Sequence, residues 1–132
     1  MVNEKIALDT NIVIDIFNNK KNIITILNSY QTIYLPITVC GELLFGAKNS
    51  AKYQENEPKC HAFISNCNLL NINELIAEEY AKTRNELKKK GRPIPENDIW
   101  IAATCIVNNV PLLTFDSDFN HVNDLTIINP NG

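Results

Sequence analysis

Four acidic residues that are far apart in the sequence each stand at the edge of an apolar segment. They lie in the stretches "ALDTN", "TVCGELLFGA", "ENDIWIAAT" and "LLTFDSDF", and they are Asp9, Glu42, Asp98 and Asp116. Four carboxylates that share one crevice repel one another, so without a partner some of them must take up protons. A hard divalent cation such as Mg²⁺ or Mn²⁺ removes that conflict, because it prefers oxygen ligands. The natural chemistry of such a site is the activation of water for in-line attack on phosphorus.

Each of these acids also has an ordinary structural explanation. Asp98 stands at the start of an expected helix, where a carboxylate serves as a cap or complements the helix dipole. Glu42 lies early in another expected helix, and Asp116 is typical of the first residue of a turn. The four acids together favour a metal site, because the expected fold brings all of them to one end of a sheet.

The elements that must position these acids alternate between short apolar strands and helices. We expect strands at 5–8, 32–37, 68–72, 111–115 and 125–129, and helices at 11–18, 23–30, 38–48, 58–67, 73–91 and 97–108. Thr38 is expected to be an N-cap, Pro58 to lie in a first helical turn, and 116–122 to form a turn or short helix. This order predicts an α/β sandwich with a mostly parallel sheet. Ligands bind beyond the carboxyl ends of the strands in such sheets, which is where Asp9 and Asp116 lie.

Composition restricts the class of protein. A chain of 132 residues suits a single domain, 1–132, with its own core, and the 45% hydrophobic and 20% charged content is that of an ordinary globular protein. No apolar run approaches the ~20 residues of a membrane span. The start "MVNEKIALD" does not have the pattern of a signal peptide, so we expect a cytoplasmic protein. The cysteines form no C-x-x-C pair, which predicts free thiols at Cys40, Cys60, Cys67 and Cys105.

The ordered set of acidic motifs resembles the PIN-domain ribonucleases, and specifically the VapC-type toxins of bacterial and archaeal toxin–antitoxin pairs. The resemblance rests on "LDTN", a Glu-Leu helix, "D-x-x-IAA" and "LLT-x-D-x-D-F", and it runs from "IALDTNIVID" to "LLTFDSDFNHV". It implies a PIN-like α/β/α sandwich with about four to five strands in the sheet. It also implies an Mg²⁺-dependent endoribonuclease that cleaves RNA by hydrolysis and arrests translation, with Mn²⁺ as an expected substitute.

The resemblance assigns roles to individual residues. Asp9 and Asp98 are expected to contact the metal directly, whereas Glu42 and Asp116 act through water or on a second ion. Three residues are placed to orient these carboxylates by hydrogen bonding: Thr10, Asn11 and Thr114. Asp118 falls in the same motif as Asp116, but we expect it to be an ordinary turn acid.

The resemblance also implies partners. The family usually forms homodimers and is silenced by a cognate antitoxin, for which 11–30 and 38–66 are the expected surfaces. The net charge of −3 gives no general attraction to nucleic acid. RNA must nevertheless approach an acidic site past compensating charge. The candidate phosphate contacts are Lys48, Lys52, Lys88, Lys89, Lys90 and Arg92, although such a run is also typical of a solvated helix end.

Other functions fit the residues less well. A haloacid-dehalogenase-type phosphatase needs a second Asp two residues after the first, where this chain has Asn11, and a lysine between Asp98 and Asp116, where it has none. A receiver-type signalling domain needs paired acids near the first strand and a lysine after a late strand, and this chain has neither. A non-catalytic PIN-like module that binds RNA or protein remains an alternative, but broken acids would be its signature. His61 and His121 do not adjoin the acidic motifs and are expected to be surface or partly buried residues.

Overall fold

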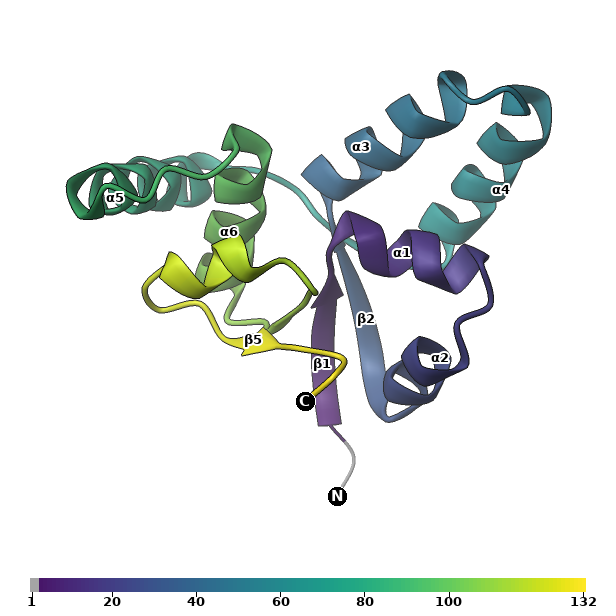
Figure 1. Cartoon of the computed structure of the whole chain (residues 1–132), viewed down its shortest axis with the longest axis horizontal. Coiled ribbons are helices and arrows are strands. Elements are labelled where there is room, and N and C mark those ends of the chain that lie inside the picture. Colours follow the sequence, from purple (N-terminus) through teal and green to yellow (C-terminus); the bar gives the residue numbers. More distant parts are fainter. Residues whose placement is uncertain (1–2) are drawn as a thin grey trace.

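The computed structural model describes residues 3–132, in which helices and strands alternate along the chain (Figure 1). The elements are β1 (Asn3–Leu8), α1 (Thr10–Phe17), α2 (Lys21–Asn28), β2 (Tyr30–Pro36), α3 (Ile37–Lys48), α4 (Tyr53–Ser65), β3 (Asn68–Leu70), α5 (Glu74–Lys90), α6 (Glu96–Asn108), β4 (Leu112–Leu113), a 3-10 helix (Ser117–His121) and β5 (Ile127–Ile128). Within this part of the chain, no helix is long and apolar enough to cross a membrane.

The strands form one sheet in the order β3-β2-β1-β4-β5, and every neighbouring pair is parallel. This confirms the prediction of an α/β fold with a mostly parallel sheet of four to five strands. In Figure 1, α1 to α4 lie on one side of β1 and β2, and α5, α6 and the 3-10 helix lie on the other. Because β1 is the central strand, its carboxyl end opens into the middle of the molecule.

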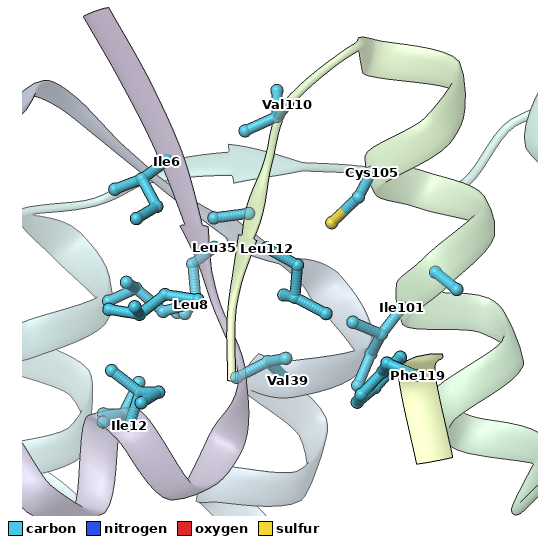
Figure 2. Packing of buried hydrophobic residues seen from close by; sticks show 14 of the residues in the cluster. Ile6, Leu8, Ile12, Leu35, Val39, Ile101, Cys105, Val110, Leu112 and Phe119 are labelled. Atoms are coloured by element: carbon cyan, nitrogen blue, oxygen red, sulfur yellow. The ribbon is translucent and has the colours of Figure 1, made fainter. Parts of the chain in front are cut away.

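The core occupies both faces of the sheet (Figure 2). Ile6 and Leu8 of β1 pack on one face with Ile12 of α1, whereas Leu112 of β4 packs on the other face near Ile101 of α6; all five are fully buried. Burying an aliphatic side chain of this size stabilises the fold by about 1.5–3 kcal/mol relative to exposure. The strand ends that carry the acids are therefore held by a packed core on both sides.

Helix α4 is longer than its sequence predicts. The expected helix starts at Pro58, but α4 begins at Tyr53 and Pro58 lies inside it, so the placement of this proline in a first turn is wrong. A proline in a helix interior leaves the carbonyl four residues earlier without its donor. That residue is Gln54, and both side chains are exposed, so the lost hydrogen bond lies on the solvent side of the helix.

Helix α3 and the later strands also differ from expectation at their ends. Thr38 is not the N-cap of α3, because the cap position is Pro36 and the helix begins at Ile37. The segments 111–115 and 125–129 are predicted as full strands, but β4 and β5 contain only two residues each. Thr114 still donates its backbone N–H to the carbonyl of Ile128 at 3.1 Å, and the chain then bends, with the Asp116 N–H bonded to Thr114 Oγ1.

Candidate metal centre

Asp9 is the first residue after β1, and it is buried, with 6% of its surface exposed. Its Oδ1 accepts a hydrogen bond from the backbone N–H of Thr10 at 2.9 Å, so the residue also caps α1. Its Oδ2 accepts from Thr114 Oγ1 at 2.7 Å. Burial raises the pKa of Asp9, and the charge of Asp116 adds to this, although the two hydrogen bonds act in the opposite direction. The Asp9 carboxylate is therefore fixed in orientation before any ligand binds.

Glu42 lies in the second turn of α3, half-buried, and it is tied to Asp9 through one residue. The Thr10 hydroxyl donates to Glu42 Oε1 at 3.1 Å, while the Thr10 backbone donates to Asp9. Burial raises the pKa of Glu42, the Thr10 hydrogen bond opposes the shift, and the charge of Asp9 adds to it. Thr10 thus holds two carboxylates from different elements in one arrangement.

Asp116 and Asp118 lie on a tight bend after β4. Thr114 Oγ1 accepts from the Asp116 N–H at 3.0 Å, and Asp116 Oδ1 accepts from the Asp118 N–H at 2.9 Å, which caps the 3-10 helix. Phe119, the next residue, is fully buried in the core beside Ile101 (Figure 2). The buried ring and the two short hydrogen bonds direct both carboxylates away from the core.

Asp98 completes the group from the first turn of α6. Its carboxylate lies with those of Asp116 and Asp118, so that one oxygen from each falls within 4.8 Å of the others. Within residues 3–132 the Asp98 side chain makes no hydrogen bond, and the cap position of α6 is Pro95, so Asp98 does not act as a side-chain cap. Burial raises the pKa of Asp98 to about 7, and four negative charges add to the shift. These come from Asp9, Asp116, Glu42 and Asp118.

The structure gathers all four predicted acids and adds a fifth. Asp118 is predicted to be an ordinary turn acid, but its carboxylate lies beside those of Asp98 and Asp116. The spacing Asp-x-Asp in "FDSDF" is the signal that could have identified it, because a capped bend returns the second side chain toward the first. Thr10 and Thr114 bond to the acids as their positions suggest, whereas Asn11 is exposed and bonds to none of them among the described residues.

The donor set suits a hard divalent cation. Every charged group that acts on Asp98 is itself an acid, and the five side chains offer only oxygen. The softer candidates lie elsewhere: Cys40, Cys60 and Cys105 are buried, Cys67 is partly buried and all four are free, as predicted. His61 is exposed and His121 partly buried, also as predicted. A cation that prefers thiolate or imidazole has no ligands in this cluster.

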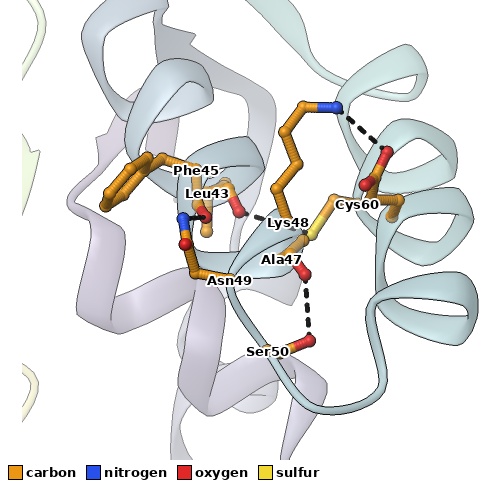
Figure 3. A network of polar contacts seen from close by, with 8 residues as sticks. Leu43, Phe45, Ala47, Lys48, Asn49, Ser50 and Cys60 are labelled. Atoms are coloured by element: carbon orange, nitrogen blue, oxygen red, sulfur yellow. Dashed lines mark hydrogen bonds and ion pairs between the residues drawn. The ribbon is translucent and has the colours of Figure 1, made fainter.

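The predicted basic residues lie on different elements. Lys48 of α3 pairs with Glu57 at 3.1 Å, in the polar contacts between α3 and α4 that Figure 3 shows. Lys90 donates to the carbonyl of His121 and is therefore used inside the molecule. The other four are exposed, at the start of α4 and around the end of α5: Lys52, Lys88, Lys89 and Arg92.

An apolar groove borders the site on the side of α1, α3 and α4. It has a volume of about 330 Å³ and extends from Thr10 and Glu42, at the acids, to Phe17 and Cys60. Ile14 lies in its wall and is one of the exposed large hydrophobic side chains, with 43% of its surface exposed. The groove therefore joins the acidic cluster to an uncovered apolar surface.

Comparisons with known proteins agree with this geometry. The PIN domain family model matches residues 6–125. Ribonuclease VapC1 of Haemophilus influenzae is 34% identical over 123 residues, which cover 89% of this chain and 92% of the relative. The chain belongs to the VapC ribonucleases of the PIN-domain family.

Solved PIN-domain structures carry the same fold. The structure of VapBC-1 from nontypeable Haemophilus influenzae aligns with a TM-score of 0.86 and 31% identity, over 97% of this chain and 99% of that one. A toxin–antitoxin complex from Klebsiella pneumoniae aligns with a TM-score of 0.77 and 25% identity, over 95% and 97%. The resemblance inferred from the motifs is thereby confirmed.

Proposed function

We propose that this PIN-domain protein is an endoribonuclease toxin of a toxin–antitoxin system, and that its five carboxylates hold Mg²⁺ or Mn²⁺ for hydrolysis of RNA. The Haemophilus influenzae relative is a ribonuclease, and the Klebsiella pneumoniae structure is a toxin–antitoxin complex. The observation that carries the metal assignment is the gathering of Asp98, Asp116 and Asp118 within 4.8 Å, with Asp9 and Glu42 near enough to raise the pKa of Asp98.

The side chains divide the work of the reaction. Asp9, held by Thr114 and Thr10, offers a pre-oriented oxygen, and Asp98 offers a second one from the opposite side of the sheet. Glu42 and Asp116 would act mainly through water or on a second ion, and Asp118 would offer a further oxygen beside Asp98 and Asp116. A bound divalent ion supplies neutralisation of charge and activation of water for attack on phosphorus. The protein residues supply oriented oxygen ligands and a negative charge that a cation would neutralise.

RNA reaches this acidic surface along basic side chains. Lys88, Lys89 and Arg92 at the end of α5 are the candidate phosphate contacts on one side, and Lys48 and Lys52 are those on the other. The Lys48–Glu57 pair has an exposed ammonium, and surface pairs of this kind contribute only about 0–1 kcal/mol, so the pair does not prevent Lys48 from contacting a phosphate. Each phosphate contact should contribute to a salt dependence of RNA binding.

The cognate antitoxin occupies the apolar groove beside the acids. The groove is lined by residues of α1, α3 and α4, within the expected surfaces 11–30 and 38–66. A segment bound there would cover Ile14 and reach the acidic end at Glu42, so that inhibition and apolar burial coincide. The working form is a homodimer. A non-catalytic module remains the second candidate, but an intact group of five acids gives it no support.

The test is cleavage of RNA by the purified toxin in Mg²⁺, in Mn²⁺ and in excess EDTA. Wild-type protein should cleave with either ion and stop when the metal is chelated. Asp98→Asn should lose more than ~100-fold in cleavage rate, because it removes a ligand and not merely an outer-sphere partner. Asp15→Asn is the matched control, since Asp15 lies on α1 and has no role in the cluster. Undiminished cleavage in EDTA would reject the metal mechanism, and undiminished cleavage by Asp98→Asn would reject the site.

A further inference from the structure

One face of α5 is tied to the segment that follows the last two acids. Lys90 Nζ donates to the carbonyl oxygen of His121 at 2.8 Å and to Asn123 Oδ1 at 2.7 Å. The Asn123 amide in turn donates to Glu86 Oε2 at 2.8 Å. The side chain of Asn123 is thus held between two residues of α5 that are one helical turn apart.

The residues of α5 that contact this segment lie along one face of the helix. The residues that reach the segment repeat every four positions and so share one face of the helix: Lys82, Glu86 and Lys90. Lys82 Nζ approaches Asp124 Oδ2 at 3.8 Å, one residue beyond Asn123. The end of α5 is itself fixed, because Leu87 is only 1% exposed and Gly91 closes the helix at a φ of 68°. These contacts therefore connect the segment to a packed and capped end of α5.

The tied segment contains little regular secondary structure. His121 is the last residue of the 3-10 helix, which is capped by Asp116 and carries Asp118 in its first turn. The strands on either side, β4 and β5, contribute two residues each to the ladder. Because this helix has only five residues, we expect a shift of the His121 carbonyl to be transmitted to both acids. Phe119 and Val122 anchor the helix and the residue after it in the core, and Lys90 binds the carbonyl of His121 between them.

The Lys90 contacts set geometry and do not neutralise charge. Both acceptors are neutral, one a carbonyl and the other an amide oxygen, and among residues 3–132 no carboxylate pairs with this ammonium. Lys89, the residue before it, is equally exposed and makes no hydrogen bond or ion pair in the same part of the chain. The two lysines carry the same charge at adjacent positions of α5. Comparing them separates the effect of the Lys90 hydrogen bonds from the effect of its charge.

We propose that Lys90 is a positioning residue that sets the Asp116 and Asp118 carboxylates through the end of the 3-10 helix. This inference rests on the proposed metal site. It assigns Lys90 a different role from its neighbours Lys88 and Lys89, which remain candidate phosphate contacts. The arrangement of the last two acids then depends on a contact from α5, an element that contributes no acid to the cluster.

The experiment compares Lys90→Met, Lys90→Arg and Lys89→Met in the full chain. Mn²⁺ affinity, measured by calorimetry without RNA, should fall about fivefold in Lys90→Met, somewhat less than the ~10–100-fold for removing a direct partner of a ligand. Lys90→Arg keeps a donor for both acceptors and should retain most of the affinity. Lys89→Met should keep its Mn²⁺ affinity within about twofold of wild type, because a solvent-exposed charge is largely screened. Single-turnover cleavage should fall with Mn²⁺ affinity in Lys90→Met, while RNA binding in EDTA is unchanged.

The outcomes separate this inference from the proposed function. If wild-type protein binds no Mn²⁺, the metal site and the inference fail together. If wild type binds but Lys90→Met retains full affinity, only the positioning role is overturned, even if the variant melts at a lower temperature. Equal weakening of RNA binding in EDTA by Lys90→Met and Lys89→Met, with Mn²⁺ affinity intact, would instead assign both lysines to the RNA.

Discussion

The two halves of the acidic cluster are built differently. On the β1 side, Asp9 and Glu42 accept hydrogen bonds from Thr10 and Thr114, and three such bonds hold their oxygens in place. On the α6 side, Asp98 accepts none among the described residues and faces four other acids. Both halves are at least partly buried, and burial raises the pKa of all three acids, that of Asp98 to about 7. Hydrogen bonds within the protein orient the carboxylates on the β1 side, whereas Asp98 on the α6 side would be oriented by a bound cation.

This difference has a physical cause in the fold. Asp9 and Thr114 follow adjacent parallel strands, β1 and β4, so their side chains emerge side by side at the same sheet edge. Asp98 comes from a helix that packs across the sheet, and Pro95 occupies the position where a capping side chain would lie. Hydrogen bonds therefore orient the carboxylates of Asp9 and Glu42, whereas the Asp98 carboxylate accepts none among the described residues.

The largest expected effects distinguish ligands from the acids that act through water. Asp9→Asn should lower the cleavage rate and Mn²⁺ affinity together, by more than about tenfold each, because a charged oxygen ligand is lost. Glu42→Gln and Asp116→Asn should reduce turnover strongly while changing the affinity for the first ion less. Calorimetry and single-turnover cleavage on the same preparations measure both quantities. Equal losses of Mn²⁺ affinity at all of these positions would contradict the division of roles.

A smaller effect is expected from the threonine that supports Asp9. Thr114→Val removes the 2.7 Å hydrogen bond to Asp9 and the acceptor for the Asp116 N–H, while leaving the shape of the side chain nearly unchanged. Cleavage should fall by about tenfold, at the lower end of the range for losing a partner of a metal ligand. Thr104→Val is the control, because Thr104 is equally buried but bonds within α6, to the carbonyl of Trp100. Equal losses in both variants would point to packing and not to the site.

The smallest effect concerns stability without metal. The pKa of Asp98 rises from about 4 in the unfolded chain to about 7 in the folded one, so the folded state binds the extra proton between these values. The resulting stabilisation is complete below about pH 4 and is lost as the pH rises to 7. Asp9 and Glu42 shift in the same direction. Thermal melting in EDTA from pH 4 to 8 should show this decline, and Asp98→Asn should flatten it and be no less stable than wild type at pH 8.

The sequence was most informative where one local pattern determined one element. The apolar run before Asp9 predicted β1, and Asn73 with Gly91 predicted both ends of α5, because caps and buried strands leave strong local signals. Pro58 misled because a local preference for first turns was overridden by the packing of α4, where Cys60 is buried against α3 (Figure 3). Helix boundaries set by tertiary contacts are not visible in a local window.

The acids themselves were predictable as a set, but their individual environments were not. Asp9 stands just before a helix and Asp98 in the first turn of one, and nothing local indicates that Asp9 accepts two hydrogen bonds and Asp98 none. Asp118 was underestimated because its carboxylate joins the cluster only after the chain bends at Asp116. The partner of Lys90 lies 31 residues away along the chain, so no spacing rule could assign it.

The most direct test of the central claim is to count the protons released when Mn²⁺ binds. Because burial and four neighbouring acids raise the pKa of Asp98 to about 7, this side chain should be protonated at pH 6 and must lose its proton to become a ligand. Calorimetry in buffers of different ionisation enthalpy should find about one proton released per first ion at pH 6 and almost none at pH 9. Asp98→Asn should show no such difference between the two pH values. Tight Mn²⁺ binding by wild type with no proton release at pH 6 would contradict the assignment of Asp98 as a metal ligand.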